Sequence, residues 1–294
     1  MQALIKKERW PGGYSRRGIP LVRPGQAVLP DQPVLRMQRS KDSAPLGDEL
    51  LPAGLHGRVV EITARGGVLI ESHSTIVYGA LGAGSQVAGT LTLWRGSEHG
   101  AAQTIPPGAI LAVPGQLTLQ LLRRALDSGV VGVVAASIAL RDFEGFLRTD
   151  LVQLLSSINV EAALTHLPPL TVMLTEGIGS LAMPDMTRDL FIRHQGSIAL
   201  LSGLTSVRWG LSPDLYVSLP PEEAAEQPAQ PARKLTYGTR VYVRSGEHQG
   251  TTGIVDYLFV YPQVFASGVK ARSVRLALMD GTFLIVPQIH VEPI

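Results

Sequence analysis

Small residues with the spacing of an anion-binding loop lie near the middle of this chain of 294 residues. Gly177, Gly179 and Ala182 satisfy a relaxed G-x-G-x-x-A pattern, in which small residues let backbone amides approach a phosphate group at the start of a helix. Residues 175–184 follow a predicted strand and open a predicted helix, where α/β sheets bind ligands. One interpretation is a site for a small anionic metabolite or a nucleotide. The alternative is a tight turn that needs glycine for its backbone angles.

Three polar side chains accompany this loop. Glu176 ends an apolar strand, where partial burial would raise the pKa of its carboxyl and suit it to acid or base chemistry, and a solvated or capping carboxylate is the alternative. Arg208 could line the same ligand site at this loop and hold an anion there, or it could pack with Trp209 on the surface. The predicted ligand-binding residues are Glu176, Gly177, Gly179, Ser180 and Arg208.

Positive charge is concentrated toward the N-terminus. The formal net charge is +2, whereas residues 1–45 hold nine Lys or Arg against three Asp or Glu. An uneven basic segment is typical of proteins with a phosphate-rich partner, and a solvated tail is the alternative. Trp10 and Tyr14, which lie among these cations, could stack on bases or pack on the protein's own surface. The predicted nucleic-acid-binding residues are Lys6, Lys7, Arg9, Arg16, Arg17, Lys270 and Arg272.

The residue inventory excludes several kinds of chemistry. The chain has no cysteine, so disulfides, thiolate nucleophiles and Cys-based metal sites cannot form. Its seven histidines are scattered, and no pair has the i, i+4 spacing with a nearby carboxylate that metal sites use. Neither a G-x-S-x-G nor a Walker pattern occurs. We therefore predict no catalytic residue, no metal and no cofactor, and we expect a protein without enzymatic activity.

Hydrophobic patterning favours a cytoplasmic protein that does not enter a membrane. The longest apolar run, residues 129–140, is shorter than the roughly 18 residues that span a bilayer and is typical of a buried strand. The basic residues 1–9 are followed by Trp10, Pro11 and two glycines instead of an apolar segment, so a secretory signal is not predicted. An oligomer is a further hypothesis, because short exposed β modules often complete themselves by self-association.

The spacing of apolar residues predicts a multidomain α+β protein. Residues 1–20 are expected to form a basic flexible arm, and residues 21–104 an all-β module of short alternating strands. Residues 105–219 alternate strands with helices, which predicts βαβ units and a mainly parallel sheet. A linker rich in Pro, Ala and Glu is expected at 220–234. Within 105–219 the predicted strands are 109–113, 130–135, 170–175 and 197–201, and the predicted helices are 117–126, one or two within 143–156, and 184–195.

The all-β module resembles a known fold. Its segments Gly25-x-x-Val28, His56-Gly57-x-Val59 and Gly84-x-x-Val87-x-Gly89-x-Leu91 are similar to the half-motifs of a barrel-sandwich hybrid, the biotinyl- or lipoyl-carrier-like fold. Carriers of this kind present a modified lysine in a tight hairpin. Lys41, the only lysine of the module, does not match that context, so the resemblance implies a structural module without a carrier role.

Residues 235–294 resemble a second family. The run Val241-x-Val243-x-x-Gly246-x-x-x-Gly250-x-x-Gly253-x-Val255 is similar to a KOW motif, in which two strands flank a glycine-punctuated turn of a small SH3-like β-barrel. Asp280-Gly281 adds a hairpin signal between two further strands. KOW domains bind RNA or protein in ribosomal proteins and transcription-elongation factors, so the resemblance implies an interaction module.

Electrostatics leave the kind of partner open. Residues 235–294 hold five Lys or Arg against four Asp or Glu, which creates little field to attract a phosphate backbone. We expect a non-enzymatic, multi-module binding protein that associates with RNA or a nucleic-acid-linked protein complex through the KOW-like barrel and the basic N-terminal arm. The alternative function is binding of a small anionic metabolite or nucleotide at residues 175–184.

Overall fold

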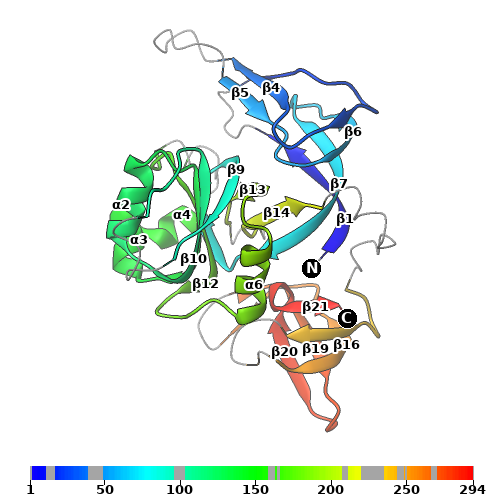
Figure 1. Ribbon diagram of the computed structural model, residues 1–294. Coiled ribbons are helices and arrows are strands. Elements are labelled where there is room, and N and C mark those ends of the chain that lie inside the picture. Colours follow the sequence, from blue (N-terminus) through cyan, green and yellow to red (C-terminus); the bar gives the residue numbers. More distant parts are fainter. Residues whose placement is uncertain are drawn as a thin grey trace. The chain divides into compact units, whose positions relative to one another are not determined.

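The computed structural model describes residues 2–10, 17–38, 49–95, 103–157, 163, 166–206, 211–219, 235–243, 248, 250–265 and 270–293. The structure is mixed α+β and consists mostly of curled sheets (Figure 1). It divides into two compact units, the first containing residues 1–206 with 212–231 and the second containing residues 232–294 with 207–211. None of the helices in the described ranges is long and apolar enough to cross a membrane.

Four parallel strands form the centre of the first unit. They are hydrogen-bonded side by side in chain order. Every residue of the third strand is buried, because helices cover both faces of a parallel sheet of this kind. These positions agree with the strands expected near residues 109, 130 and 170. The four strands are β9 (Gln86–Leu93), β10 (Ala109–Leu117), β11 (Gly132–Ile138) and β12 (Thr171–Ile178).

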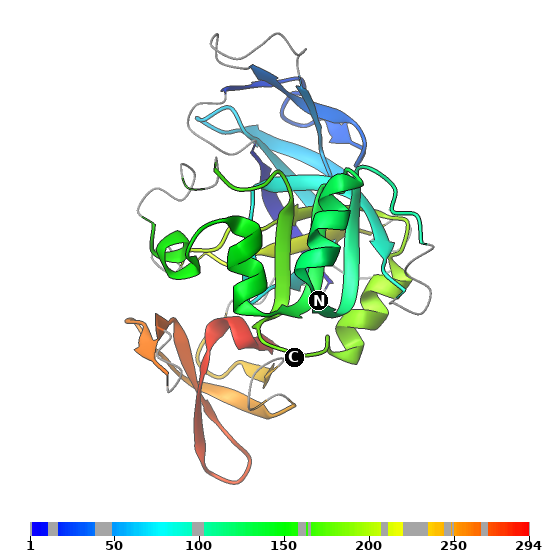
Figure 2. The same ribbon diagram turned by 90° about the vertical axis from the view of Figure 1, so that its left-hand side faces the viewer.

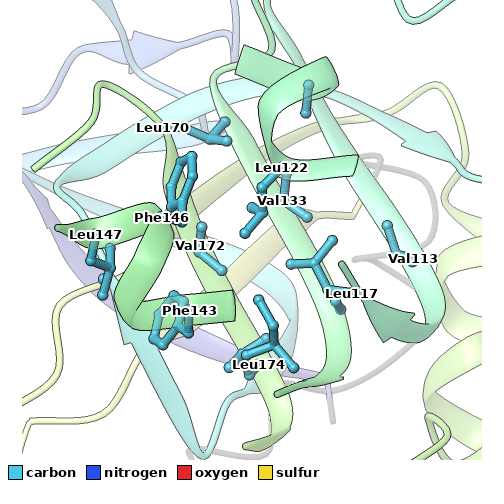
Figure 3. Packing of buried hydrophobic residues seen from close by; sticks show 14 of the residues in the cluster. Val113, Leu117, Leu122, Val133, Phe143, Phe146, Leu147, Leu170, Val172 and Leu174 are labelled. Atoms are coloured by element: carbon cyan, nitrogen blue, oxygen red, sulfur yellow. The ribbon is translucent and has the colours of Figure 1, made fainter. Parts of the chain in front are cut away.

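Three helices pack against one face of this sheet. Thr118 and Asp150 each begin a helix as N-cap residues, since their side-chain oxygens accept hydrogen bonds from amides three residues later. Leu122 and Phe143 pack among alternate residues of the strands, such as Val133 (Figure 3). Figure 2, seen from this side, shows helices in front of the strands. The helices are α2 (Leu119–Asp127), α3 (Leu140–Leu147) and α4 (Leu151–Ser156).

A fourth helix, α6 (Asp185–Arg193), covers the opposite face. Its Phe191 belongs to a cluster with Val134 and Met173. These two residues alternate along β11 and β12 with Val133 and Val172, which face the other three helices. Alternation of side chains across a strand therefore gives the parallel sheet two buried faces.

Antiparallel strands extend the parallel sheet on both sides. β8 (Leu81–Ala83) pairs with β12, and β13 (Ile198–Ser202) pairs with β9. Beyond β13 the sheet continues through β14 (Asp214–Ser218), β7 (Val68–Tyr78), β6 (Gly57–Ile62) and β3 (Ala27–Val28), and β1 (Gln2–Arg9) pairs with β7. A separate sheet contains β2 (Arg17–Pro20), β4 (Pro33–Gln38) and β5 (Glu49–Pro52).

Two features differ from the sequence-based expectations. Residues 2–9 form a strand along the full length of residues 68–75 of β7, where a flexible arm was expected. Ala3 and Arg9, which lie on the same face of this strand, are buried. In addition, the boundary expected at residues 104 and 105 falls within one continuous sheet, because β9 pairs with both β10 and β13.

The second unit contains a five-stranded antiparallel sheet in the order β20-β19-β16-β15-β21. Its inner face buries Val241, Val255, Leu276 and Val286 in one cluster. A further two-stranded sheet contains β17 and β18. The elements are β15 (Arg240–Val243), β16 (Thr252–Leu258), β17 (Gln263–Val264), β18 (Lys270–Ala271), β19 (Ser273–Ala277), β20 (Phe283–Pro287), the 3-10 helix η1 (Gln288–His290) and β21 (Val291–Pro293).

Candidate functional site

The loop at residues 175–184 is fastened to the neighbouring strands through its own backbone. The Ser137 hydroxyl of β11 accepts a hydrogen bond from the Leu181 amide at 2.8 Å and donates to the carbonyl of the same residue at 2.9 Å. The amides of Gly179 and Met183 donate to strand carbonyls, each at 2.9 Å. Three amides of the predicted anion cradle therefore donate to oxygen atoms of the protein itself.

The two glycines of this loop adopt backbone angles that favour glycine. Gly177 has φ 87° and Gly179 has φ 142°, a region that residues with a Cβ atom rarely enter. The interpretation as a tight turn accounts for both residues.

The remaining predicted ligand residues do not converge on a site. Ser180 Oγ donates to Gln116 Oε1 at 3.1 Å, and the side-chain Nε2 of Gln116 donates to the Gly179 carbonyl at 3.1 Å. Glu176 is half-buried within β12, and Arg208 lies outside the described residues. Among the predicted residues, the sequence neighbours Gly179 and Ser180 both bond the side chain of Gln116, and these hydrogen bonds close the turn.

The basic residues of β1 lie in three different environments. The Lys6 side chain is 58% exposed, and its Nζ lies 3.6 Å from Glu71. Lys7 is half-buried, and Arg9 is only 1% exposed. A phosphate group outside the protein can reach Lys6 but not Arg9, which corrects the role expected for Arg9. Arg16 and the side chain of Arg17 lie outside the described residues.

Arg9 holds together three parts of the first unit. Its Nε donates to the Pro52 carbonyl at 2.9 Å, and its Nη1 donates to the carbonyl and side-chain oxygens of Gln86 at 3.1 and 3.0 Å. Gln86 in turn donates to the Glu8 carbonyl at 3.0 Å. Burial lowers the pKa of the Arg9 guanidinium to about 10, although the charge of Glu49 opposes this effect. The buried charge is accommodated in part because these oxygens accept hydrogen bonds from Nε and Nη1.

Lys7 and Asp214 form a second link, between β1 and β14. Lys7 Nζ lies 2.6 Å from Asp214 Oδ2, which also accepts from the Tyr216 hydroxyl at 2.9 Å. Lys7 Nζ lies 4.8 Å from the centroid of the Tyr216 ring. Burial, and then the negative charge of Asp214, raise the pKa of the Tyr216 hydroxyl. This Lys7–Asp214–Tyr216 cluster gives Lys7 a role in closing the curled sheet.

The solvent-facing side of the five-stranded sheet exposes large apolar side chains. Ile254 is 49% exposed, Tyr257 48%, Phe283 60% and Ile285 44%. Such side chains are unexceptional singly, but a group of them on one sheet face is typical of an interaction surface. We call this surface the outer face and define it by Arg240, Ile254, Tyr257, Arg275, Phe283 and Ile285.

The strand register places these residues in two adjacent rows. Arg240 lies opposite Ile254, which lies opposite Ala277, and Ala277 lies opposite Phe283, so the first row crosses four strands. In the second row, Arg275 lies opposite both Tyr257 and Ile285. The outer face is therefore continuous across the sheet.

Arg275 is the centre of the outer face. It forms an ion pair with Asp256, with Nε 2.7 Å from Oδ2. Its guanidinium carbon lies 4.8 Å from the centroid of the Phe283 ring and 5.7 Å from that of Tyr257. The outer face thus presents a neutralised cation between two aromatic rings.

Two predicted cations of the second unit lie apart from the outer face. Lys270 belongs to β18, and its side chain lies outside the described residues. Arg272 is exposed between β18 and β19, and its carbonyl accepts from the Gln288 amide at 2.7 Å.

Sequence reasoning missed the apolar members of the outer face. The signal for them is the alternation of exposed Ile254, Phe283 and Ile285 with buried Val255 and Val286. A β-bulge interrupts this alternation after Val255, so a count of every second residue along the strand assigns the positions that follow to the wrong face.

In the parts of the chain that the structure describes, no three His, Asp or Glu side chains lie together in a way that could hold a metal ion. No family model, curated protein or solved structure matches this chain. The outer face is therefore the candidate functional site on its physical properties alone.

Proposed function

We propose that this chain is a non-enzymatic, multi-module binding protein of the cytoplasm whose C-terminal unit binds single-stranded RNA on its outer face. In this proposal the C-terminal unit is an SH3-like barrel of the KOW type, and the N-terminal β strands form a structural module of the barrel-sandwich kind. Of the N-terminal cations, Lys7 and Arg9 are not part of the binding site, because Lys7 is paired with Asp214 and Arg9 is buried.

The observation that carries the proposal is the arrangement of Tyr257 and Phe283 on either side of Arg275. Proteins bind single-stranded nucleic acid by stacking bases on exposed aromatic rings, with arginine adding cation–π attraction. Ile254 and Ile285 would extend this platform by contacting the apolar faces of bases. The resemblance to KOW domains supports the same class of partner.

Charge on the outer face predicts the character of the binding. Arg275 is neutralised by Asp256, and Arg240 remains as the exposed cation of the first row. For a single strand, each phosphate contact contributes about −0.7 to the slope of log K against log salt concentration. We therefore expect a slope between zero and about −1.5, because stacking provides most of the affinity.

Fluorescence anisotropy with a labelled 12-nucleotide RNA of mixed sequence tests this proposal, using the full chain at about 50 mM salt, where phosphate contacts are strong. Tyr257→Ala and Phe283→Ala should each weaken binding by about 5- to 150-fold, which corresponds to about 1–3 kcal/mol per stacked base. Met279→Ala is the matched control, since Met279 is 92% exposed at a hairpin of the same unit but is not part of the outer face.

Absence of RNA binding at this salt concentration would reject the proposal and leave a protein surface as the partner of the outer face. Binding that both aromatic substitutions leave unchanged would place the RNA site elsewhere. A salt slope steeper than about −3 would likewise contradict it, since it would require more than four phosphate contacts.

A further inference from the structure

β20 is the terminal strand of the five-stranded sheet. In the described part of the chain it pairs with β19, from Ser273 opposite Pro287 to Ala277 opposite Phe283. The free N–H and C=O groups of such an edge form a template for another strand, and natural edges are commonly protected by charged side chains, by proline or by short strand length. β20 has the sequence FLIVP, with no charged residue. Its edge therefore lacks protection by charge, and its one proline, Pro287, lies at the end of the strand and leaves residues 283–286 able to pair.

The register shows which residues direct their backbone groups to this open edge. The Leu278 amide donates to the Thr282 carbonyl at 2.9 Å, so these residues form a hydrogen-bonded pair. Because such pairs alternate along an antiparallel ladder, the next residues to bond β19 are the even-numbered ones of β20. Phe283 and Ile285 consequently point their N–H and C=O groups away from β19. Pro287 fits the same pattern, since its missing N–H lies on the open side.

We infer that the open edge of β20 binds β20 of a second copy of this chain. In an antiparallel, twofold-symmetric pair, Phe283 of one copy lies opposite Ile285 of the other, and each such pair exchanges two hydrogen bonds. The four free donors and the four acceptors of Phe283 and Ile285 are then all satisfied. An aromatic residue opposite a β-branched residue adds side-chain stabilisation.

Charge also favours a second copy as the occupant. A twofold axis brings identical side chains near one another, which repels any strand with a net charge at the contact. β20 carries no charge, and the cation on the neighbouring strand, Arg275, is already paired with Asp256. Because the edge carries no charge and its backbone donors equal its acceptors in number, it is complementary to a second copy of itself.

The dimer would contain one ten-stranded sheet with both outer faces on the same side. In this register, residues 283–285 of each β20 lie opposite one another, and a contact of this length is smaller than a standard stable interface. The dimer is therefore concentration-dependent, and the inference does not rest on RNA binding.

Sedimentation velocity of the full chain without RNA tests the inference. We expect the mass to rise from 31.5 kDa toward twice this value as concentration increases. Ile285→Pro removes an N–H that faces the open edge and spares the bonds to β19, so this variant should remain monomeric with an unchanged circular dichroism spectrum. Ile285→Val keeps the amide and is the control, which should dimerise like the parent chain.

Hydrogen exchange provides a second measurement that needs no substitution. The amides of Phe283 and Ile285 should become protected at high concentration and exchange freely at low concentration. The amides of Leu284 and Val286, which bond β19, should be protected throughout. A chain that stays monomeric at the highest concentration, a dimer that survives Ile285→Pro, or exchange at Phe283 and Ile285 that ignores concentration would overturn the inference.

Discussion

The Nζ atom of Lys7 lies 2.6 Å from Oδ2 of Asp214, a residue 207 positions later in the chain. This contact joins β1 to β14 directly. Each of these strands also pairs separately with β7. The positive charge from which the sequence predicts a nucleic-acid-binding arm thus serves, at Lys7, to close a curled sheet.

Replacing Lys7 by Met should destabilise the first unit by about 3–5 kcal/mol, because it leaves the buried carboxylate of Asp214 without its cation. The double variant Lys7→Met with Asp214→Asn should cost less than the sum of the two single changes, since it removes both charges. Urea unfolding measures these free energies. Lys6→Met is the control, and its exposed pair with Glu71 should contribute about 0.5 kcal/mol at most. Equal effects of the Lys6 and Lys7 substitutions would contradict this role of Lys7.

The central part of the fold could be predicted from the sequence because its signals are local. Strands and helices alternate through residues 109–201 with long apolar runs, and each expected element there has a counterpart within a few residues in the structure. β1 could not be predicted in this way. Four of its eight residues are charged, and the burial of Arg9 depends on carbonyls contributed by residues 52 and 86.

The periodicity of apolar residues could not predict which strands pair with one another. β9 lies between β10 and β13 in the sheet, and nothing local to residues 86–93 specifies either neighbour. The outer face was hidden for a related reason, because Ile254 and Val255 both favour a strand while only the register shows that they face opposite sides. The loop at 175–184 matched a ligand motif by its glycines, whereas the acceptors of its amides, on β10 and β11, are distant in sequence.

Arg9→Lys should destabilise the protein by about 2 kcal/mol, even though the positive charge is kept. A lysine has its donors on one atom and cannot reach both the Pro52 carbonyl and the oxygens of Gln86, so buried acceptors lose their partners. Thermal unfolding followed by circular dichroism detects the loss. Arg65→Lys is the control, because the Arg65 side chain is 52% exposed and its pair with Glu8 contributes less than about 1 kcal/mol. If Arg9→Lys and Arg65→Lys are equally stable, the fork of donors on the Arg9 guanidinium does not contribute to stability.

Ser137→Ala should destabilise the protein by about 1–3 kcal/mol, since the hydroxyl both accepts from and donates to the backbone of Leu181. Ser180→Ala in the same loop is the control and should change stability by less than about 0.5 kcal/mol, because Ser180 bonds an exposed glutamine. Guanidinium unfolding compares the two variants.

No nucleotide should stabilise the chain through the loop at residues 175–184, because the amides of Gly179, Leu181 and Met183 are already bonded within the protein. A thermal-shift series with nucleoside mono-, di- and triphosphates checks this expectation. A ligand present at 100 times its dissociation constant would add about 2.7 kcal/mol. A shift of that size, lost in a Gly179→Val variant that still folds, would restore the loop as an anion site.

The Asp280 carboxylate should titrate below the ordinary value of 3.8. The side chain and then the amide of Thr282 donate to its Oδ1, at 2.6 and 2.9 Å, and both bonds favour the charged form and lower its pKa. A group whose pKa is lower in the folded state stabilises the fold above its unfolded pKa, and this contribution disappears as the pH falls through the folded pKa. The β19–β20 hairpin should therefore lose stability only at acidic pH, below about 4.

Carbon-13 NMR titration of the Asp280 carboxyl measures this pKa directly. Thr282→Val removes the hydroxyl bond and keeps the amide bond, so the pKa should rise part of the way toward 3.8. Thr252→Val, in the same sheet but away from the hairpin turn, is the control and should leave the titration of Asp280 unchanged. If Thr282→Val does not move the midpoint, the hydroxyl does not stabilise the carboxylate, and the turn is held by the backbone bonds of Leu278 with Gly281 and Thr282 alone.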